Sequence, residues 1–208
     1  MAVRILGRAS SINVRKVLWT CTEIGVSYER EDWGAGYQST DREEFRRLNP
    51  NGLIPVIVDE GVVLWESNTI CRYLATRHER LDLLPRSARD RALVEMWMDW
   101  QATELNGSWL YAFYSLVRKS PAHTDASSIE ASIRSWNRNV GLIERQLERT
   151  GAFIAGAAFT LADVVIGLSI NRWRMTPMER PELPAVRAYF ERLRSRAGFT
   201  EHVDNGVA

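Results

Sequence analysis

Cysteine is scarce in this chain, and long apolar runs are missing from it. Cys21 and Cys71 are the only cysteines among 208 residues, and neither has a metal-ligand partner at a recognisable spacing. We interpret both as buried reduced thiols and expect no metal site. No apolar run approaches the roughly 20 residues that span a bilayer, and no basic segment with a long apolar region follows Met1. We therefore expect a cytoplasmic protein that has no membrane association.

Neither sign of charge dominates the composition. The 27 basic residues are interleaved with 26 acidic ones, which leaves a formal net charge of +1. A charge that small supplies no field to hold nucleic acid, so we expect no nucleic-acid partner. Lysine occurs only as Lys16 and Lys119. We interpret this bias as bacterial genome composition rather than as a site.

The length and the residue types indicate a globular protein with two unequal domains. Hydrophobic residues make up 45% of the chain and charged residues 25%, which is the balance of an ordinary folded protein. A chain of 208 residues is long for one small domain and short for three.

The first 80 residues predict a small α/β unit with the order βαβαββα. Short β-type runs occupy residues 3–6, 26–31, 55–58 and 62–64. Helical patterns occupy a segment that begins beside Ser10 or Ser11 and ends near Gly25, and then residues 42–48 and 67–78. Turn residues at 59–61 separate the last two strands, a spacing that favours an antiparallel hairpin.

The rest of the chain predicts an all-helical unit. Residues 80–88 have no period and contain Pro85, so we place a linker there, between domains at residues 1–79 and 89–208. An apolar stripe follows at residues 93, 96, 97 and 100, and such stripes usually face a core. Thr160 and Asp163 match a capping box ahead of an apolar run that we expect to be buried on all sides.

The loop before the first helix is the first candidate site. It contains Ser10, Ser11 and Asn13. A helix N-terminus presents unpaired backbone N–H groups and a partial positive charge, which favours an anion or a thiolate placed above it. The alternative is that Ser10 or Ser11 simply caps the helix.

The segment of Leu53, Ile54 and Pro55 is the second candidate. Proline can open a strand but not occupy its middle, so Pro55 lies at the boundary between turn and sheet. If the bond before it is cis, the N–H and C=O of Ile54 point into a cleft, where they would pair with another peptide. An ordinary trans turn is the alternative.

Glu66 and Ser67, at the start of a predicted helix, form the third candidate. The pair could act only as a helix cap and a surface charge. Together with the first two segments, however, it offers an acceptor for an ammonium group and donors for a carboxylate. Those are the two charges of an α-amino acid head.

A dense group of aromatic residues in the helical unit could line a pocket for an apolar ligand. Its members are Trp109, Tyr111, Phe113 and Tyr114, with Trp97 and Trp100 nearby in the sequence. For Trp97 and Trp100 core packing is the competing interpretation.

These segments resemble a known family. Residues 11–18 (SINVRKVL), 49–55 (NPNGLIP) and 66–74 (ESNTICRYL) are similar, in this order, to the three glutathione-site signatures of cytosolic glutathione transferases. Residues 160–163 (TLAD) resemble that family's capping motif. The resemblance covers nearly the whole chain. It implies a thioredoxin-like α/β domain that binds glutathione, an all-α domain that lines a second-substrate pocket, and a homodimer with Trp65 and Met96 near the interface.

The resemblance also implies roles for individual residues. Ser11 matches the serine that contacts the glutathione sulfur in theta-like and phi-like classes, and Asn13 and Ser10 are the other candidates for that contact. The backbone of Ile54 would pair with the cysteinyl unit ahead of a cis Pro55, with Leu53 beside it. Further roles are implied for Glu66 and Ser67 at the γ-glutamyl head, and for Gln38, Asn49 and Asn51 at the glycyl end or in loop support.

Departures from other classes narrow the expected chemistry. The loop after the first strand contains no tyrosine and no cysteine, which disfavours the tyrosine-type classes and those that form a mixed disulfide. We expect a transferase that activates the glutathione thiolate for attack on a hydrophobic electrophile or a hydroperoxide. Glutathione would be a co-substrate, and no tightly bound cofactor is expected. The alternatives are a glutathione-dependent isomerase or dehalogenase, and a non-catalytic glutathione-binding or assembly module.

Overall fold

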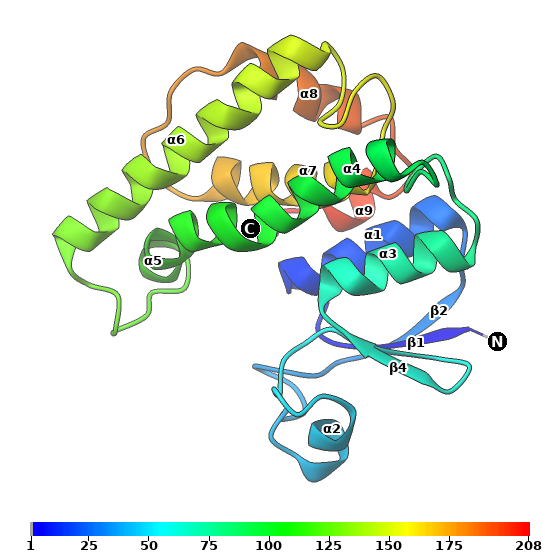
Figure 1. Ribbon diagram of the computed structural model, residues 1–208. Helices are drawn as coiled ribbons and strands as arrows, with labels where there is room; N and C mark the ends of the chain where they lie inside the picture. Colours follow the sequence, from blue (N-terminus) through cyan, green and yellow to red (C-terminus); the bar gives the residue numbers. More distant parts are fainter. Residues whose placement is uncertain (1) are drawn as a thin grey trace.

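The computed structural model describes residues 2–208, and its N-terminal part is a four-stranded sheet with helices on both faces (Figure 1). The strands are β1 (Val3–Leu6), β2 (Tyr28–Glu31), β3 (Val56–Asp59) and β4 (Val62–Trp65), in the spatial order β2-β1-β3-β4. The helices are α1 (Ile12–Ile24), α2 (Glu43–Leu48) and α3 (Ser67–Arg77). β1 runs parallel to β2 and antiparallel to β3, and β3 and β4 form an antiparallel hairpin. The predicted order βαβαββα is confirmed.

The apolar positions that predicted the first helix form its buried face. Val14, Val17, Leu18 and Cys21 are each at most 3% exposed. The helix ends at Gly25, whose φ of 81° suits glycine and whose N–H donates to the carbonyl of Cys21 (2.9 Å). α1 packs against α3, and both lie between the sheet and the helical part of the molecule, with α2 on the other side of the sheet (Figure 1).

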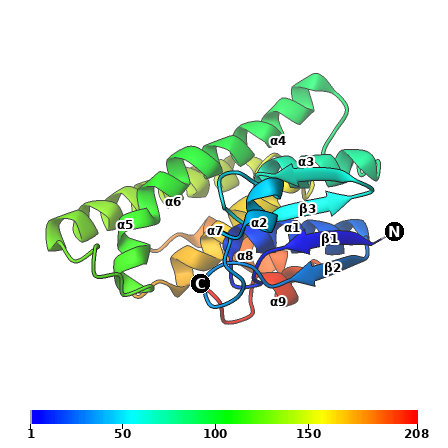
Figure 2. The same ribbon diagram turned by 90° about the horizontal axis from the view of Figure 1, so that it is seen from below.

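The remainder of the described chain is helical, as expected. Its elements are α4 (Ala88–Trp100), a π-helical turn η1 (Gln101–Leu105), α5 (Asn106–Leu116), α6 (Ala126–Thr150), α7 (Leu161–Met175), α8 (Pro184–Leu193) and α9 (Phe199–His202). Every residue of α7 from Leu161 to Trp173 is buried. Figure 1 and Figure 2 both place α7 in the middle of the molecule, where it packs against α1, α4 and α8. None of the helices in residues 2–208 is long and apolar enough to cross a membrane.

The side of α4 that faces the core differs from the predicted one. Val94 and Met98 are buried, whereas Leu93 and Met96 are 43% and 52% exposed. The predicted stripe is therefore wrong for residues 93 and 96, whereas Trp97 and Trp100 are partly buried and pack against the core, as expected for them. Apolar residues occur on more than one side of this helix, so the pattern alone could not select the side that meets α7.

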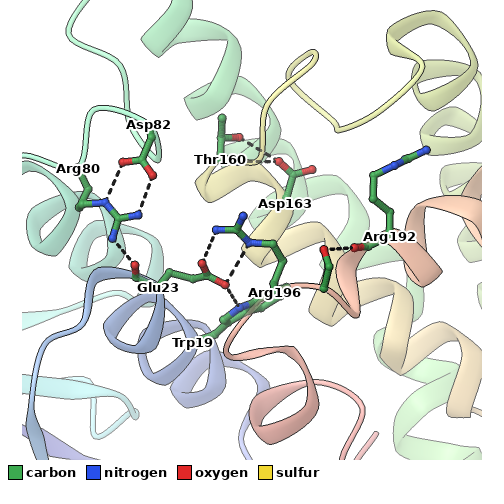
Figure 3. A network of polar contacts seen from close by, with 9 residues as sticks. Trp19, Glu23, Arg80, Asp82, Thr160, Asp163, Arg192 and Arg196 are labelled. Atoms are coloured by element: carbon green, nitrogen blue, oxygen red, sulfur yellow. Dashed lines mark hydrogen bonds and ion pairs between the residues drawn. The ribbon is translucent and has the colours of Figure 1, made fainter.

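Glu23, near the end of α1, connects the sheet-containing part to the helical part. Trp19 Nε1 donates to Glu23 Oε1 (2.8 Å) and Arg196 Nη2 donates to Oε2 (2.5 Å) (Figure 3). Arg80, which pairs with Asp82, donates to the backbone carbonyl of Glu23. Residues from α1 and from the segment after α8 thus meet at the Glu23 carboxylate, and the segment after α3 contacts the backbone of the same residue.

The segment predicted as a linker contains both exposed and buried residues. Leu83 and Leu84 are buried, and the carbonyl of Leu83 accepts the Leu161 N–H (3.0 Å). α4 begins at Ala88, after Ser87 accepts the Asp90 N–H (3.3 Å). The division of the chain at residues 80–88 into two domains stays a prediction.

Asp163 organises the start of α7. Its carboxylate accepts the N–H groups of Ile154 (2.9 Å) and Thr160 (2.8 Å) and the hydroxyl of Tyr189 (3.1 Å). Burial raises the pKa of Asp163 to about 6, while the hydrogen bonds from these donors act in the opposite direction. The acid of the predicted capping box therefore also anchors the loop before α7 and the side of α8.

We predict that Asp163→Ala lowers the free energy of unfolding by about 2–4 kcal/mol, because two buried N–H groups lose their acceptor. Urea denaturation measures the change. Asp125→Ala is the matched control, since Asp125 caps α6 through the Ser128 N–H (2.8 Å) but at an exposed position. Its loss should be clearly smaller. Equal losses in the two variants would contradict the role assigned to Asp163.

Candidate glutathione site

The loop between β1 and α1 leaves the Ser11 hydroxyl free. Ser11 is the N-cap residue of α1, yet its side chain makes no capping hydrogen bond. Its backbone is held instead, because its N–H donates to the carbonyl of Arg8 (3.1 Å) and its carbonyl accepts the Arg15 N–H (2.9 Å). The hydroxyl is only partly buried. Simple capping by the Ser11 side chain therefore does not account for this serine.

Gly7 allows this loop to lie close to the segment before β3. Its φ is 152°, and a Cβ there would come within 2.5 Å of Val14 Cγ2 and 3.2 Å of Ile54 Cβ. Any side chain at position 7 would push these two segments apart. The first turn of α1 and the residue before Pro55 are thus held next to each other.

The bond between Ile54 and Pro55 is cis. Within residues 2–208, neither the N–H nor the C=O of Ile54 forms a hydrogen bond. Pro55 is buried, and Leu53 is 64% exposed. The backbone of Ile54 therefore offers a donor and an acceptor to an added peptide, as strand addition requires.

Glu66 and Ser67 lie at the start of α3 beside Asn13 of α1. Glu66 has a φ of 70°, a value that non-glycine residues adopt rarely and most often at functional sites. Its side chain is exposed, whereas Ser67 is buried. The Ser67 hydroxyl donates to Asn13 Oδ1 (3.4 Å).

A polar cavity of about 250 Å³ opens between α1, α3 and the helices that follow α3. Its wall contains Asn13, Lys16, Glu66, Ser67, Asn68, Thr69, Arg72, Asp99, Ala102 and Asn106. Both signs of charge are present, and Arg72 pairs with Asp99 and with Glu95 (3.4 Å). The cavity suits a small zwitterionic group. Residues 2–208 contain no cluster of three or more histidine, cysteine, aspartate or glutamate side chains able to hold a metal ion.

The chain matches known proteins along nearly its whole length. Residues 10–77 match the family model described as the glutathione S-transferase N-terminal domain, and residues 126–192 match that of the C-terminal domain. Glutathione S-transferase GstB of Escherichia coli is 32% identical over 202 residues, which cover 88% of this chain and 97% of that protein. The chain belongs to the glutathione S-transferase family.

Two further comparisons bear on the site of this glutathione S-transferase. A crystal structure of the theta class enzyme of Xanthomonas axonopodis pv. citri with glutathione bound is 35% identical, with a TM-score of 0.92 and coverage of 100% of this chain and 99% of that one. Elongation factor 1-gamma 2 of rice is 31% identical over 91% of this chain, which spans 46% of that protein. The thioredoxin-like fold and the family resemblance are thereby confirmed.

Lys16 lines the polar cavity, a placement that the sequence did not reveal. It is 1% exposed, and its Nζ donates to Gln101 Oε1 (2.7 Å) and Asn68 Oδ1 (3.3 Å). Burial lowers its pKa to about 8, and nearby Glu66 acts in the opposite direction. Lys16 is interpreted from the sequence as a compositional feature, and the only local signal of its burial is its place between the apolar residues Val14 and Val17 on α1.

The residues expected near the glycyl end are not brought together. Gln38 is exposed, its Oε1 accepts from Arg42 (3.1 Å), and it borders a different cavity. Asn49 is buried and bonds within its own loop, to the Leu53 carbonyl (2.8 Å) and the Asn51 N–H (3.0 Å). The bonds of Asn49 and Asn51 support the loop that presents Ile54.

The four aromatic residues expected in the second-substrate pocket lie on two sides of α5. Trp109 and Phe113 are buried in edge-to-face contact, with ring centroids 5.4 Å apart. Tyr111 and Tyr114 instead contact His123, at centroid distances of 4.9 and 5.0 Å. The set is therefore split between an inward pair and an outward pair.

Proposed function

We propose that this glutathione S-transferase binds glutathione along the line from Glu66 to Ile54 and activates its thiol at Ser11. The observation that carries the proposal is the unpaired backbone of Ile54, held by Gly7 beside a serine whose hydroxyl is free. The ammonium of the γ-glutamyl head would pair with Glu66, and its carboxylate would accept from Ser67 at the start of α3. The cysteinyl unit would pair with Ile54.

Thiolate stabilisation accounts for the chemistry. A free thiol with a pKa of about 8.5 is roughly 3% thiolate at pH 7, and lowering this pKa by about two units requires about 2.7 kcal/mol. A hydroxyl hydrogen bond to a charged group contributes about 1.5–3 kcal/mol, and a helix N-terminus adds about 0.3–1 kcal/mol. Ser11 and the start of α1 therefore suffice without a general base. The thiolate then attacks an electrophilic carbon, and the leaving group departs with the bonding electron pair.

The competing functions differ in what they require of this site. An isomerase or dehalogenase would use the same thiolate on another substrate, so a panel of electrophiles and hydroperoxides distinguishes them. A non-catalytic module, a role suggested by the likeness to elongation factor 1-gamma 2 of rice, would bind without turnover. The combination of Ser11, Ile54, Glu66 and Ser67 favours the enzyme, since a module has no need of a free hydroxyl at the sulfur position. A cytoplasmic location is proposed with it.

We predict that Ser11→Ala raises the pKa of bound glutathione and lowers turnover at neutral pH, with little loss of glutathione affinity, because the hydroxyl acts mainly on the anion. A spectroscopic titration of the thiolate measures the pKa. Asn13→Ala should change this pKa less. Ser10→Ala is the control for the loop. If the pKa of bound glutathione changed in the Ser10 or Asn13 variant but not in Ser11→Ala, a group other than Ser11 would contact the sulfur.

We predict that Glu66→Gln weakens glutathione binding by roughly 30-fold or more, since losing one partner of a desolvated charge pair costs about 2–5 kcal/mol. Calorimetry on the folded variant measures the affinity, and Glu66→Ala should behave alike. Glu29→Gln is the matched control, because Glu29 is exposed on β2 away from the cavity. An unchanged affinity in Glu66→Gln would place the γ-glutamyl head elsewhere.

We predict a homodimer, supported by exposed apolar side chains on β4 and α4. Trp65 is 38% exposed and Met96 is 52% exposed. Light scattering at micromolar concentration should give twice the mass of the chain, and Met96→Arg should shift the protein toward monomer. Met175→Arg, at a 38% exposed position of α7, is the control. A wild-type monomer would contradict the prediction.

A further inference from the structure

Arg172, in the second half of α7, is a buried cation with no polar partner. Its side chain is 3% exposed, and no residue in the described range 2–208 accepts a hydrogen bond from its guanidinium. The guanidinium lies against two aromatic rings, 4.1 Å from the centroid of Phe113 and 4.5 Å from that of Trp109. Cation–π contact offsets only part of the cost of removing a charge from water. The position therefore favours an anion that the chain does not supply.

The neighbouring charges have the same sign. Arg118 lies 5.4 Å from the centroid of the same Phe113 ring and is exposed. Arg15, on α1, is 1% exposed, and its Nε is buried without a partner. Burial, together with the nearby charges of Arg15 and Arg118, lowers the pKa of Arg172 to about 9. Three guanidinium groups thus gather at one end of α7. Arg15 has partners, since its Nη1 and Nη2 donate to the backbone oxygens of Val207 (2.8 Å) and Ala208 (3.0 Å), whereas no acidic side chain in residues 2–208 pairs with Arg118 or Arg172.

This arginine cluster, Arg15, Arg118 and Arg172, adjoins the proposed glutathione site but lies on its α5 side. Trp109 Nε1 donates to Asn106 Oδ1 (3.1 Å), and Asn106 belongs to the wall of the polar cavity. Arg15 follows Ser11 by one helical turn. Of the two cations in the wall of the polar cavity, Arg72 is already paired with acidic side chains and Lys16 donates to Gln101 and Asn68. The unpaired positive charge of Arg118 and Arg172 therefore lies on the α5 side of the polar cavity, beside the inward aromatic pair.

We propose that the electrophilic substrate of this enzyme carries a carboxylate, which Arg172 and Arg118 bind while Trp109 and Phe113 contact its apolar part. A guanidinium presents a planar fork of donors that matches a carboxylate. Arg118 and Tyr114, which is 41% exposed, form the open edge through which the anion enters. The inference rests on the proposed transferase function and specifies its substrate class.

A matched pair of substrates isolates the charge. In 4-chloro-3-nitrobenzoate and 4-chloro-3-nitrobenzamide the thiolate of glutathione attacks the carbon that bears chlorine. A carbon–sulfur bond forms, the carbon–chlorine bond breaks, and chloride leaves with the electron pair. The two compounds differ in one group: the benzoate carries a carboxylate, and the benzamide carries a neutral amide of similar size at the same position. Enzymatic kcat/KM divided by the uncatalysed rate constant corrects for their intrinsic reactivity.

We expect the corrected kcat/KM of the wild-type enzyme to favour the benzoate by at least tenfold. Arg118→Ala and Arg172→Gln should each reduce this preference at least tenfold, and Arg172→Lys should retain part of it. Arg138→Ala, which removes an exposed charge from α6, is the control and should keep the preference. Thermal melting verifies that each variant folds. Since Arg118 is exposed, its variant tests the proposal even if the Arg172 variants are unstable.

Equilibrium binding separates this inference from the proposed function. Calorimetry with unreactive 3-nitrobenzoate and 3-nitrobenzamide should show the same preference and the same losses, whether or not either chlorinated compound is turned over. Equal binding of the two by the wild type, or a preference that survives Arg118→Ala and Arg172→Gln, would overturn the proposal. The proposal would also be overturned if the variants lost glutathione affinity, or raised the pKa of the bound thiol, by enough to explain their whole effect. In that case the cluster would bind glutathione itself.

Discussion

The burial of α7 from Leu161 to Trp173 is the constraint on which the rest of the structure depends. A helix start that is buried must have its N–H groups satisfied inside the protein. The Leu161 N–H donates to the Leu83 carbonyl, and Asp163 accepts the N–H groups of Thr160 and Ile154 just before the helix. The same carboxylate accepts from Tyr189 of α8, so the start of α7 and the outer helix are positioned together. Since α7 also packs against α1, its placement decides where the first turn of α1 points, and with it the free hydroxyl of Ser11.

α1 is shared by the sheet and by the helices, and the site follows from that position. One side of the helix covers the sheet through residues such as Val14, while Lys16 turns into the polar cavity and Arg15 toward the far end of α7. The helix start thus lies between a region of mixed charge beside Glu66 and a region of positive charge around Arg172. In the proposed reaction, a thiolate at Ser11 would lie at the junction of the two regions.

The sequence predicted the order of the helices and strands. It predicted less well which side of each helix is buried and which charged residues are buried with it. Short-range patterns were sufficient for the βαβαββα order and for the cis-compatible Pro55, because turn residues and periodicity are local properties. The side of α4 that meets the core was predicted wrongly, as exposed Leu93 and Met96 show. The burial of Lys16 and Arg172 was not predicted at all. A cation becomes buried only through contacts between distant elements, and single-sequence patterns do not record these contacts.

The distribution of charge around α1 would separate recognition of the two proposed substrates. Arg72 is already paired with acidic side chains, and with Glu66 nearby that side of α1 attracts a zwitterion rather than a plain anion. At the other side Arg172 has aromatic rings but no acid beside it, so its charge is neutralised only by what binds. An anion at Arg172 would hold the reacting carbon against the thiolate while its own charge stays at the guanidinium. Repulsion between the two anions is then screened by the cation, which is the electrostatic condition for joining two negatively charged reactants.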